Sequence, residues 1–402
     1  MAVQRMTYLL DSVPDPAYPL YRFRAGGDVR SALRDDAGHL LRTFAAFPPG
    51  SASLSLQLYY KPASAGENHG VRRLSVSLSG QAFSPAAAAS LKLLLESGPL
   101  QRFYRLVPGD PVITPELPAA CSVVRRQELL PATVTAEFNA KALSVYYAAT
   151  PFEAREENDY MLLDGVLDPL SEPALVTIDI SPAAIGHEAA AHTRYLSLLQ
   201  QVNHVFSLGD DDLFAPRGGE WRDAARPLHV REPLVDELLQ QQRRFHETLR
   251  QPHLRFRITV SAQSLHLAQL LASVVGEAAF ENGSYELLKQ AAPQEGKALS
   301  DGSLPGRIAE LYETLWQLGT AATPDELLGV FRLPAASVGS PCCIPRNTDP
   351  PSEASGDLLI MGHDDQGSGG SGPAVVRGLP PGQLAKHLFV SGMPGSGKTT
   401  AV

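Results

Sequence analysis

Three segments of the chain alternate apolar and polar residues with the period of a half-buried β-strand. Leucine alternates with serine or glutamine over residues 53–60, leucine and valine alternate with arginine and serine over 72–79, and apolar residues alternate with arginine and threonine over 254–261. We therefore predict that these segments are antiparallel strands with one face in a core. A further strand is predicted at 175–180, where Ser181-Pro182 should stop it, and others are predicted at 133–138, 142–147 and 285–288.

Helical periodicity predicts the elements between these strands. Residues 85–97 follow Ser84, a good cap, and their leucines recur on one face. Thr323-Pro324-Asp325-Glu326 has the pattern of a capping box that opens a short helix. Strands that alternate with helices in this way predict a sheet with helices packed on one side. Further helices are expected at 159–167, 233–250, 267–275 and 304–318.

Shifts in composition divide the chain into parts. We expect an α+β domain over residues 1–150, a helix-rich α+β domain over 151–334, and a linker over 335–357 that is rich in Pro, Ser and Gly. Strands at 358–361 and 374–376 should then open an α/β domain that occupies 358–402. Residues 335–357 and 363–373 should be irregular, because Pro and Gly weaken regular pairing.

Composition excludes several classes of protein. With 44% hydrophobic and 19% charged residues, the 402-residue chain has the make-up of a globular protein. A net charge of −9 argues against a surface coated in basic residues. No stretch approaches the roughly 20 apolar residues of a membrane span, and a cytoplasmic location is expected. The three cysteines, Cys121, Cys342 and Cys343, lack metal-ligand spacing and are interpreted as reduced structural thiols.

The strongest chemical signal lies at residues 392–399. This segment fits G-x-x-x-x-G-K-[ST], and the apolar run 388–390 supplies the strand that precedes such a loop. Its glycines allow backbone N–H groups to surround a phosphate, Lys398 would reach the β- and γ-phosphate oxygens, and Thr399 would bind Mg²⁺. We therefore predict a site for ATP and Mg²⁺ with nucleotide contacts from Gly392, Met393, Pro394, Gly395, Ser396, Gly397, Lys398, Thr399 and Thr400.

Hydrolysis of ATP needs further groups. A P-loop enzyme also requires a Walker B carboxylate for Mg²⁺ and a residue that orients the attacking water. Neither can lie in the two residues after Thr400. We therefore expect the chain to be the N-terminal part of a longer ATPase and to be inactive alone. The alternative, a chance Gly/Ser-rich loop like the tract at 367–372, does not explain why strand, motif and paired threonines agree.

Residues 323–402 resemble the approach to the P-loop in the HerA/FtsK superfamily, which includes HerA-like and type IV secretion ATPases. The resemblance is carried by TPDELLGVFRLPAAS, LLIMGHD and LPPGQLAKHLFVSGMPGSGKTT, with His387 before the P-loop strand. It implies a RecA-like α/β ATPase domain, a homo-oligomeric ring, and ATP-driven movement of DNA or a secretion substrate, with Lys398 and Thr399 as the catalytic contacts.

One departure supports an alternative. Met393-Pro394 stands where the superfamily more often has Thr or Ala, and the G-x-P-G-S-G-K spelling is commoner in AAA+ ATPases and small kinases. The alternative is an AAA+ or kinase-like P-loop protein whose N-terminal domains bind a protein partner.

Other polar groups have an ordinary structural interpretation. Five arginines could contact DNA phosphates, but the solvated face of one helix and one strand explains them equally well and is favoured. His387 is interpreted as a packed histidine, and the acidic segment 210–212 as a surface loop. The arginines are Arg243, Arg244, Arg250, Arg255 and Arg257.

Overall fold

The computed structural model divides into two compact units, residues 1–347 and 348–402, and each is described by itself. The expected boundary at residue 150 falls inside the first unit. The structure describes residues 3–14, 16, 21, 25, 28–62, 74–110, 116–134, 143–153, 172–203, 232–281, 283–289, 306–335, 346–347, 359–364 and 375–379.

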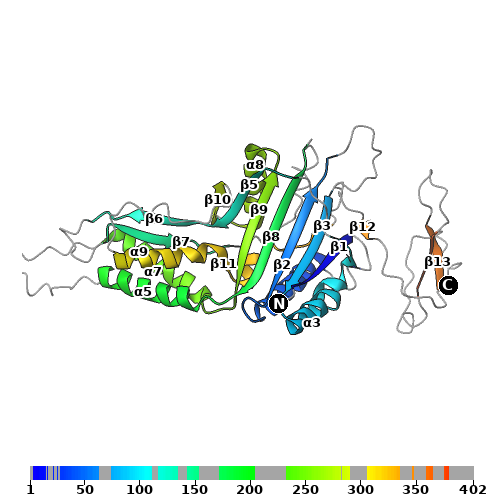
Figure 1. Ribbon diagram of the computed structural model, residues 1–402, viewed down its shortest axis with the longest axis horizontal. Coiled ribbons are helices and arrows are strands. Elements are labelled where there is room, and N and C mark those ends of the chain that lie inside the picture. The colour runs from blue at the N-terminus through cyan, green and yellow to red at the C-terminus, as the bar shows by residue number, and fades with distance from the viewer. Residues whose placement is uncertain are drawn as a thin grey trace, which may run out of the picture. The chain divides into compact units, whose positions relative to one another are not determined.

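A ten-stranded sheet forms the framework of the first unit (Figure 1). Its order is β10-β5-β9-β8-β2-β3-β1-β12, with β11 also paired to β9 and β4 to β1. Every pairing is antiparallel except that of β12 with β1. The strands are β1 (Gln4–Pro14), β2 (Ala52–Tyr60), β3 (Leu74–Ala82), β4 (Arg105–Pro108), β5 (Ala119–Arg125), β8 (Ala174–Ala183), β9 (His253–Ala262), β10 (Tyr285–Lys289), β11 (Ala321–Ala322) and β12 (Arg346–Asn347).

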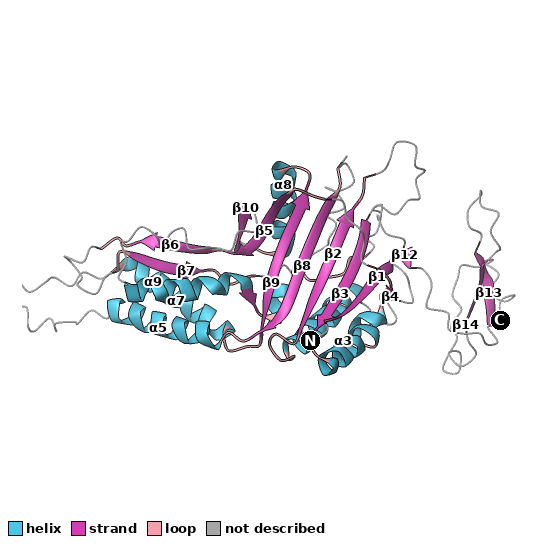
Figure 2. Ribbon diagram, viewed as in Figure 1, coloured by secondary structure: helices cyan, strands magenta, loops and turns pink. Residues whose placement is uncertain are grey.

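Alternation places one face of this sheet in the main core. In β2, Leu54, Leu56 and Leu58 are buried, whereas the serine and glutamine residues between them are partly exposed. The helices α2 (Val29–Ala45), α3 (Pro85–Glu96) and α8 (Leu265–Ala279) share the core with these leucines (Figure 2). The three antiparallel strands predicted from alternation are confirmed, as is the packing of helices against a sheet.

Eight of the ten strands form two repeats with the same connectivity, residues 4–108 and 119–289, whereas β11 and β12 lie outside them. In each repeat the first strand (β1 or β5) pairs with the third (β3 or β9), and the second strand (β2 or β8) pairs with the third on its other side. A helix, α3 or α8, follows the third strand, and a last strand (β4 or β10) returns to pair with the first.

The register of the two repeats agrees residue by residue. Ala52 lies opposite Ala82 in the first repeat, and Ala174 lies opposite Ala262 in the second. By this correspondence Leu56 is equivalent to Ile178, and these two residues lie directly opposite each other where β2 pairs with β8. An approximate twofold axis therefore passes between them.

The second repeat carries a helical module that the first repeat lacks. It combines the antiparallel pair β6 (Gln127–Pro131) and β7 (Val145–Ala149) with α5 (Gly186–Asn203), α7 (Pro233–Thr248) and α9 (Gly306–Trp316), which lie together in Figure 1. Its separate core contains Tyr146, Tyr147, Tyr195 and Tyr312. The 3₁₀ turn η2 (Gln317–Thr320), β11 and the short helix α10 (Pro324–Leu327) then lead the chain back to the sheet, and a further 3₁₀ turn, η1 (Pro99–Arg102), follows α3.

The second unit contains one described element, an antiparallel pair of β13 (Leu359–Asp364) with β14 (Val375–Leu379). Both strands were predicted, although they run further than expected, so that residues 363–364 are not irregular. Residues 346–347 were also expected to be irregular but form β12, which pairs with the end of β1 beyond the last residues that β4 covers.

Several expected boundaries were wrong. β8 continues through Pro182, which pairs with β9 after the pairing of β8 with β2 has ended at Ile180, so the missing N–H disturbs no ladder on that side. Leu270, one of the apolar residues from which the helix at 267–275 was predicted, is exposed. Thr133 and Val134 lie outside any strand, and the predicted helix at 159–167 lies outside the described residues.

Four elements were not predicted from the pattern of apolar and polar residues, namely β1, α2, β5 and β6.

Equivalent caps at the two repeats provide a test. Ser84 accepts a hydrogen bond from the Ala87 N–H at 3.2 Å, and Ser264 accepts one from the Leu267 N–H at 3.3 Å. We expect Ser84→Ala and Ser264→Ala each to lower the free energy of unfolding by about 1 kcal/mol. The two losses should add, because the caps share no partner. Urea unfolding of the single and double variants measures these losses. A loss in the double variant well below the sum of the two single losses would show that the two caps do not act independently.

Candidate functional site

The nucleotide site predicted at 392–400 lies outside the described residues, as do His387, Cys342, Cys343 and the acidic loop 210–212. β14 is the last described element before the loop. The polar groups that the structure does bring together are in the first unit, at the junction between the sheet and the helical module.

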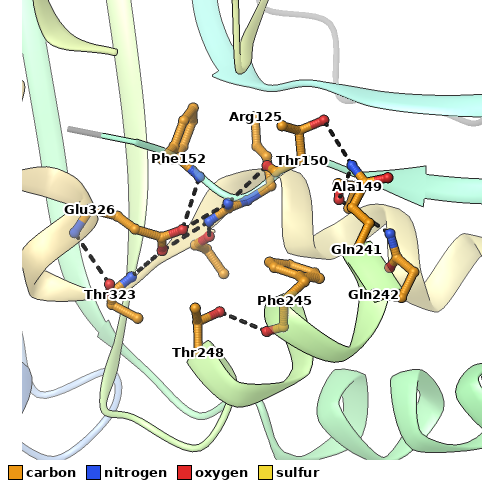
Figure 3. Close-up of polar contacts among 11 residues, drawn as sticks. Arg125, Ala149, Thr150, Phe152, Gln241, Gln242, Phe245, Thr248, Thr323 and Glu326 are labelled. Atoms are coloured by element: carbon orange, nitrogen blue, oxygen red, sulfur yellow. Dashed lines mark hydrogen bonds and ion pairs between the residues drawn. The ribbon is translucent and has the colours of Figure 1, made fainter. Parts of the chain in front are cut away.

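The centre of this junction is an ion pair between Arg125 and Glu326 (Figure 3). Arg125 is the last residue of β5, and its side chain has no exposed surface, while that of Glu326 in α10 is 7% exposed. Nη1 donates to Oε1 at 2.9 Å and Nη2 donates to Oε2 at 3.0 Å. The contact is therefore bidentate, the geometry in which arginine binds a carboxylate most strongly.

Backbone groups bind both side chains further, although the buried Nε of Arg125 has no hydrogen-bond partner among the described residues. The Phe152 N–H donates to Glu326 Oε1 at 3.1 Å, and the Thr323 N–H donates to Oε2 at 2.8 Å. Arg125 donates to the carbonyl oxygens of Thr150 and Ala321 at 3.1 and 2.9 Å. The same Glu326 completes the predicted capping box, because its N–H donates to the Thr323 hydroxyl.

Aromatic rings enclose the guanidinium group. The Phe152 ring centroid lies 4.5 Å from the central carbon of Arg125, and the Phe245 centroid lies 5.0 Å from it. Burial disfavours the ionised form of Glu326, but the charge of Arg125 and the hydrogen bonds outweigh it and lower the pKa of Glu326. A buried pair with this many internal partners positions elements and has no access to a substrate.

Replacement of one partner should be costly at this site. Glu326→Gln keeps the shape but leaves the Arg125 charge buried and uncompensated, so we expect a loss of about 3–5 kcal/mol in the free energy of unfolding. The adjacent Asp325 is a matched control, because its ion pair with Arg42 is largely exposed, with side chains 63% and 54% accessible. Asp325→Asn should cost less than about 1 kcal/mol. Equal losses of the two variants in denaturant unfolding would show that the buried ion pair contributes no more to stability than the exposed one.

A second polar cluster links α5 to α7 inside the helical module. His192 Nε2 lies 2.9 Å from Gln242 Oε1, and Gln242 Nε2 donates to the Ala149 carbonyl oxygen at 3.2 Å. Because that carbonyl fixes the orientation of the amide, we assign the proton of neutral His192 to Nε2. Its Nδ1 is then the acceptor for His246 Nδ1, 3.3 Å away.

Burial keeps this histidine neutral. The His192 side chain is completely buried, and desolvation is the main cause that lowers its pKa to about 4 from the ordinary value of 6.5. Desolvation also lowers the pKa of the partly exposed His246, and the positive charge of Arg250 adds to the effect.

The lowered pKa of His192 predicts a dependence of stability on pH. The unfolded chain takes up the proton near pH 6.5 and the folded chain only near pH 4, so stability is complete above 6.5 and is lost as the pH falls through this window. The loss should reach about 3 kcal/mol at the acid end. Urea unfolding between pH 4 and 8 should show the slope, and His192→Gln should flatten it. An unchanged slope in the variant would assign the acid sensitivity to other groups.

The arginines proposed as a DNA contact divide into two groups. Arg255 is bound within the protein, because it forms an ion pair with Glu188 and donates to the Gln317 carbonyl oxygen at 2.6 Å. This supports the structural interpretation for Arg255. The remaining four, Arg243, Arg244, Arg250 and Arg257, are exposed.

Two further searches of the described residues bear on function. Within the ranges given above, no group of three or more His, Cys, Asp or Glu side chains could hold a metal ion. None of the helices there is sufficiently long and apolar to cross a membrane. Cys121 is buried in the main core, as expected of a structural thiol.

Comparison with known proteins does not assign the chain to a family. No protein-family model matches the chain, and a search of curated proteins gives no significant match.

Proposed function

We propose that the chain provides the ATP-binding loop and the N-terminal region of a HerA/FtsK-like ATPase, which moves DNA or a secretion substrate through a ring of subunits. One observation carries the proposal, namely the complete motif at 392–399 directly after the apolar run 388–390. Both the spacing and the preceding apolar run are what a phosphate-binding loop requires.

Each residue of the loop has a distinct role in this proposal. The backbone N–H groups between Gly392 and Gly397 bind the β-phosphate, and Lys398 neutralises the β- and γ-phosphate oxygens. Thr399 binds Mg²⁺ through its hydroxyl oxygen. Catalysis then depends on a Walker B carboxylate and on an arginine from a neighbouring subunit, which is why a ring of subunits is part of the proposal.

Within the first unit, several contacts fix the residues that precede the second unit in the chain. α10 lies shortly before the segment that leads to the second unit, and Glu326 fixes it to β5. Close to the end of this segment, the Tyr104 hydroxyl donates to the Leu333 carbonyl oxygen at 2.9 Å, and β12 pairs with β1. These attachments hold the last described residues of the first unit against its sheet.

A second candidate function is favoured by Pro394. The sequence Gly392-Met393-Pro394-Gly395 is commoner in the phosphate-binding loops of AAA+ and kinase-like proteins. In this second function the first unit would bind a protein partner. The two functions differ in their response to DNA, because only a DNA translocase should have its hydrolysis stimulated by a duplex in a salt-dependent manner.

The loop can be tested by nucleotide binding. Lys398→Ala should abolish retention of ATP–Mg²⁺ by the full-length protein, because the main positive charge on the phosphates is lost. Lys386→Ala, outside the motif, is the matched control and should bind normally. Equilibrium binding of a fluorescent ATP analogue measures both, and wild-type affinity in Lys398→Ala would refute the assignment.

The same full-length protein tests the ring. Hydrolysis per subunit should rise with protein concentration and with added duplex DNA if neighbouring subunits complete each site. A protein that remains monomeric in light scattering yet hydrolyses ATP at an undiminished rate without DNA would favour the AAA+ or kinase-like function.

A further inference from the structure

We propose that His192 and His246 form a binding site for a divalent transition-metal ion, of the class of Zn²⁺, Ni²⁺ or Cu²⁺, that ties α5 to α7. The site is independent of the nucleotide loop. It consists of two imidazole nitrogens from different helices, with solvent completing the coordination on the partly exposed side of His246.

The distance between the two nitrogens fits a metal ion. Bonds of 2.0–2.1 Å from a tetrahedral ion to two imidazole nitrogens place those nitrogens about 3.3 Å apart. The two Nδ1 atoms are 3.3 Å apart, and the rings are within 9° of parallel with centroids separated by 5.4 Å. Because His246 is only partly buried, its ring can turn until both lone pairs converge on one ion.

The groups behind His192 resemble those behind a metal ligand. A ligating histidine normally donates its other ring N–H to an acceptor that fixes the tautomer and the ring orientation. Here the Nε2–H of His192 donates to Gln242, which the Ala149 carbonyl oxygen holds in place, while the Phe245 ring packs edge-on against the imidazole at a centroid distance of 5.4 Å. The Nδ1 atom therefore presents its lone pair towards His246.

Protonation and charge act in opposite directions at this site. Metal binding requires neutral imidazoles, and burial keeps the pKa of His192 far enough below neutrality that protons do not compete at pH 7. The positive charge of Arg250 acts on His246 and opposes a cation. Glu188, one turn before His192 on α5, is engaged by Arg255. With two protein ligands and a repelling arginine, the site should be weaker than a three- or four-ligand zinc site.

The experiment uses the full chain, freed of metal, and titrates Zn²⁺ alone without nucleotide. Zn²⁺ should raise the midpoint of thermal unfolding and bind in calorimetry, whereas Mg²⁺ at the same concentration should do neither, because imidazole is a poor ligand for Mg²⁺. His246→Gln should keep the unfolding midpoint of the metal-free protein and lose the shift with Zn²⁺. His266→Gln removes an exposed histidine on α8 and should retain the shift.

Two further variants separate this site from adventitious binding. Gln242→Leu removes the acceptor behind His192 and should weaken Zn²⁺ binding about tenfold or more. Arg250→Gln removes the opposing charge and should strengthen it. A Zn²⁺ shift that is the same in wild type and His246→Gln, or no shift in the wild type, would overturn the proposal. Loss of the shift in Thr399→Ala would also overturn it, by placing the ion at the nucleotide loop.

Discussion

The buried charge of Arg125 is the constraint around which the first unit is organised. An arginine without exposed surface needs a compensating charge and hydrogen-bond acceptors, and Glu326 and two backbone carbonyl oxygens supply these for both Nη groups of Arg125. These partners belong to α10, β11 and the turn after β7, so one side chain fixes the sheet, the helical module and the segment that leads out of the unit. Removal of the partner costs more than the pair itself contributes.

The twofold relation between the repeats explains why this charge is there. By register, Arg125 in the second repeat is equivalent to Leu10 in the first, and Leu10 is buried in the main core. The first repeat has no helical module at this edge, so an apolar side chain is sufficient. In the second repeat the same position faces a junction between two cores, where a bidentate ion pair can orient the neighbouring elements in a way that an apolar contact cannot.

Local patterns were sufficient to predict much of the sheet but not the junction. Strands β2, β3 and β9 alternate strictly, and the capping box at 323–326 is defined by four consecutive residues, so both could be predicted. Arg125 and Glu326 are 201 residues apart, and no periodicity relates them. The pair His192 and His246 likewise meets only because α5 packs against α7. The nucleotide site proposed at 392–400 is the opposite case, because its motif consists of consecutive residues and can be recognised without the fold.

The pairing of β2 with β8 has a consequence for the order in which the chain folds. All strands of the first repeat have been synthesised by residue 108, whereas β8 begins only at Ala174. Until then the outer edge of β2 presents a row of unpaired N–H and C=O groups, which is the kind of edge that captures strands from other chains. Pairing with β8 of the second repeat therefore protects the β2 edge of the first repeat. The rate at which residues 109–173 are synthesised, or a chaperone bound meanwhile, would determine whether β2 of a nascent chain pairs with its own β8 or with a strand of another chain.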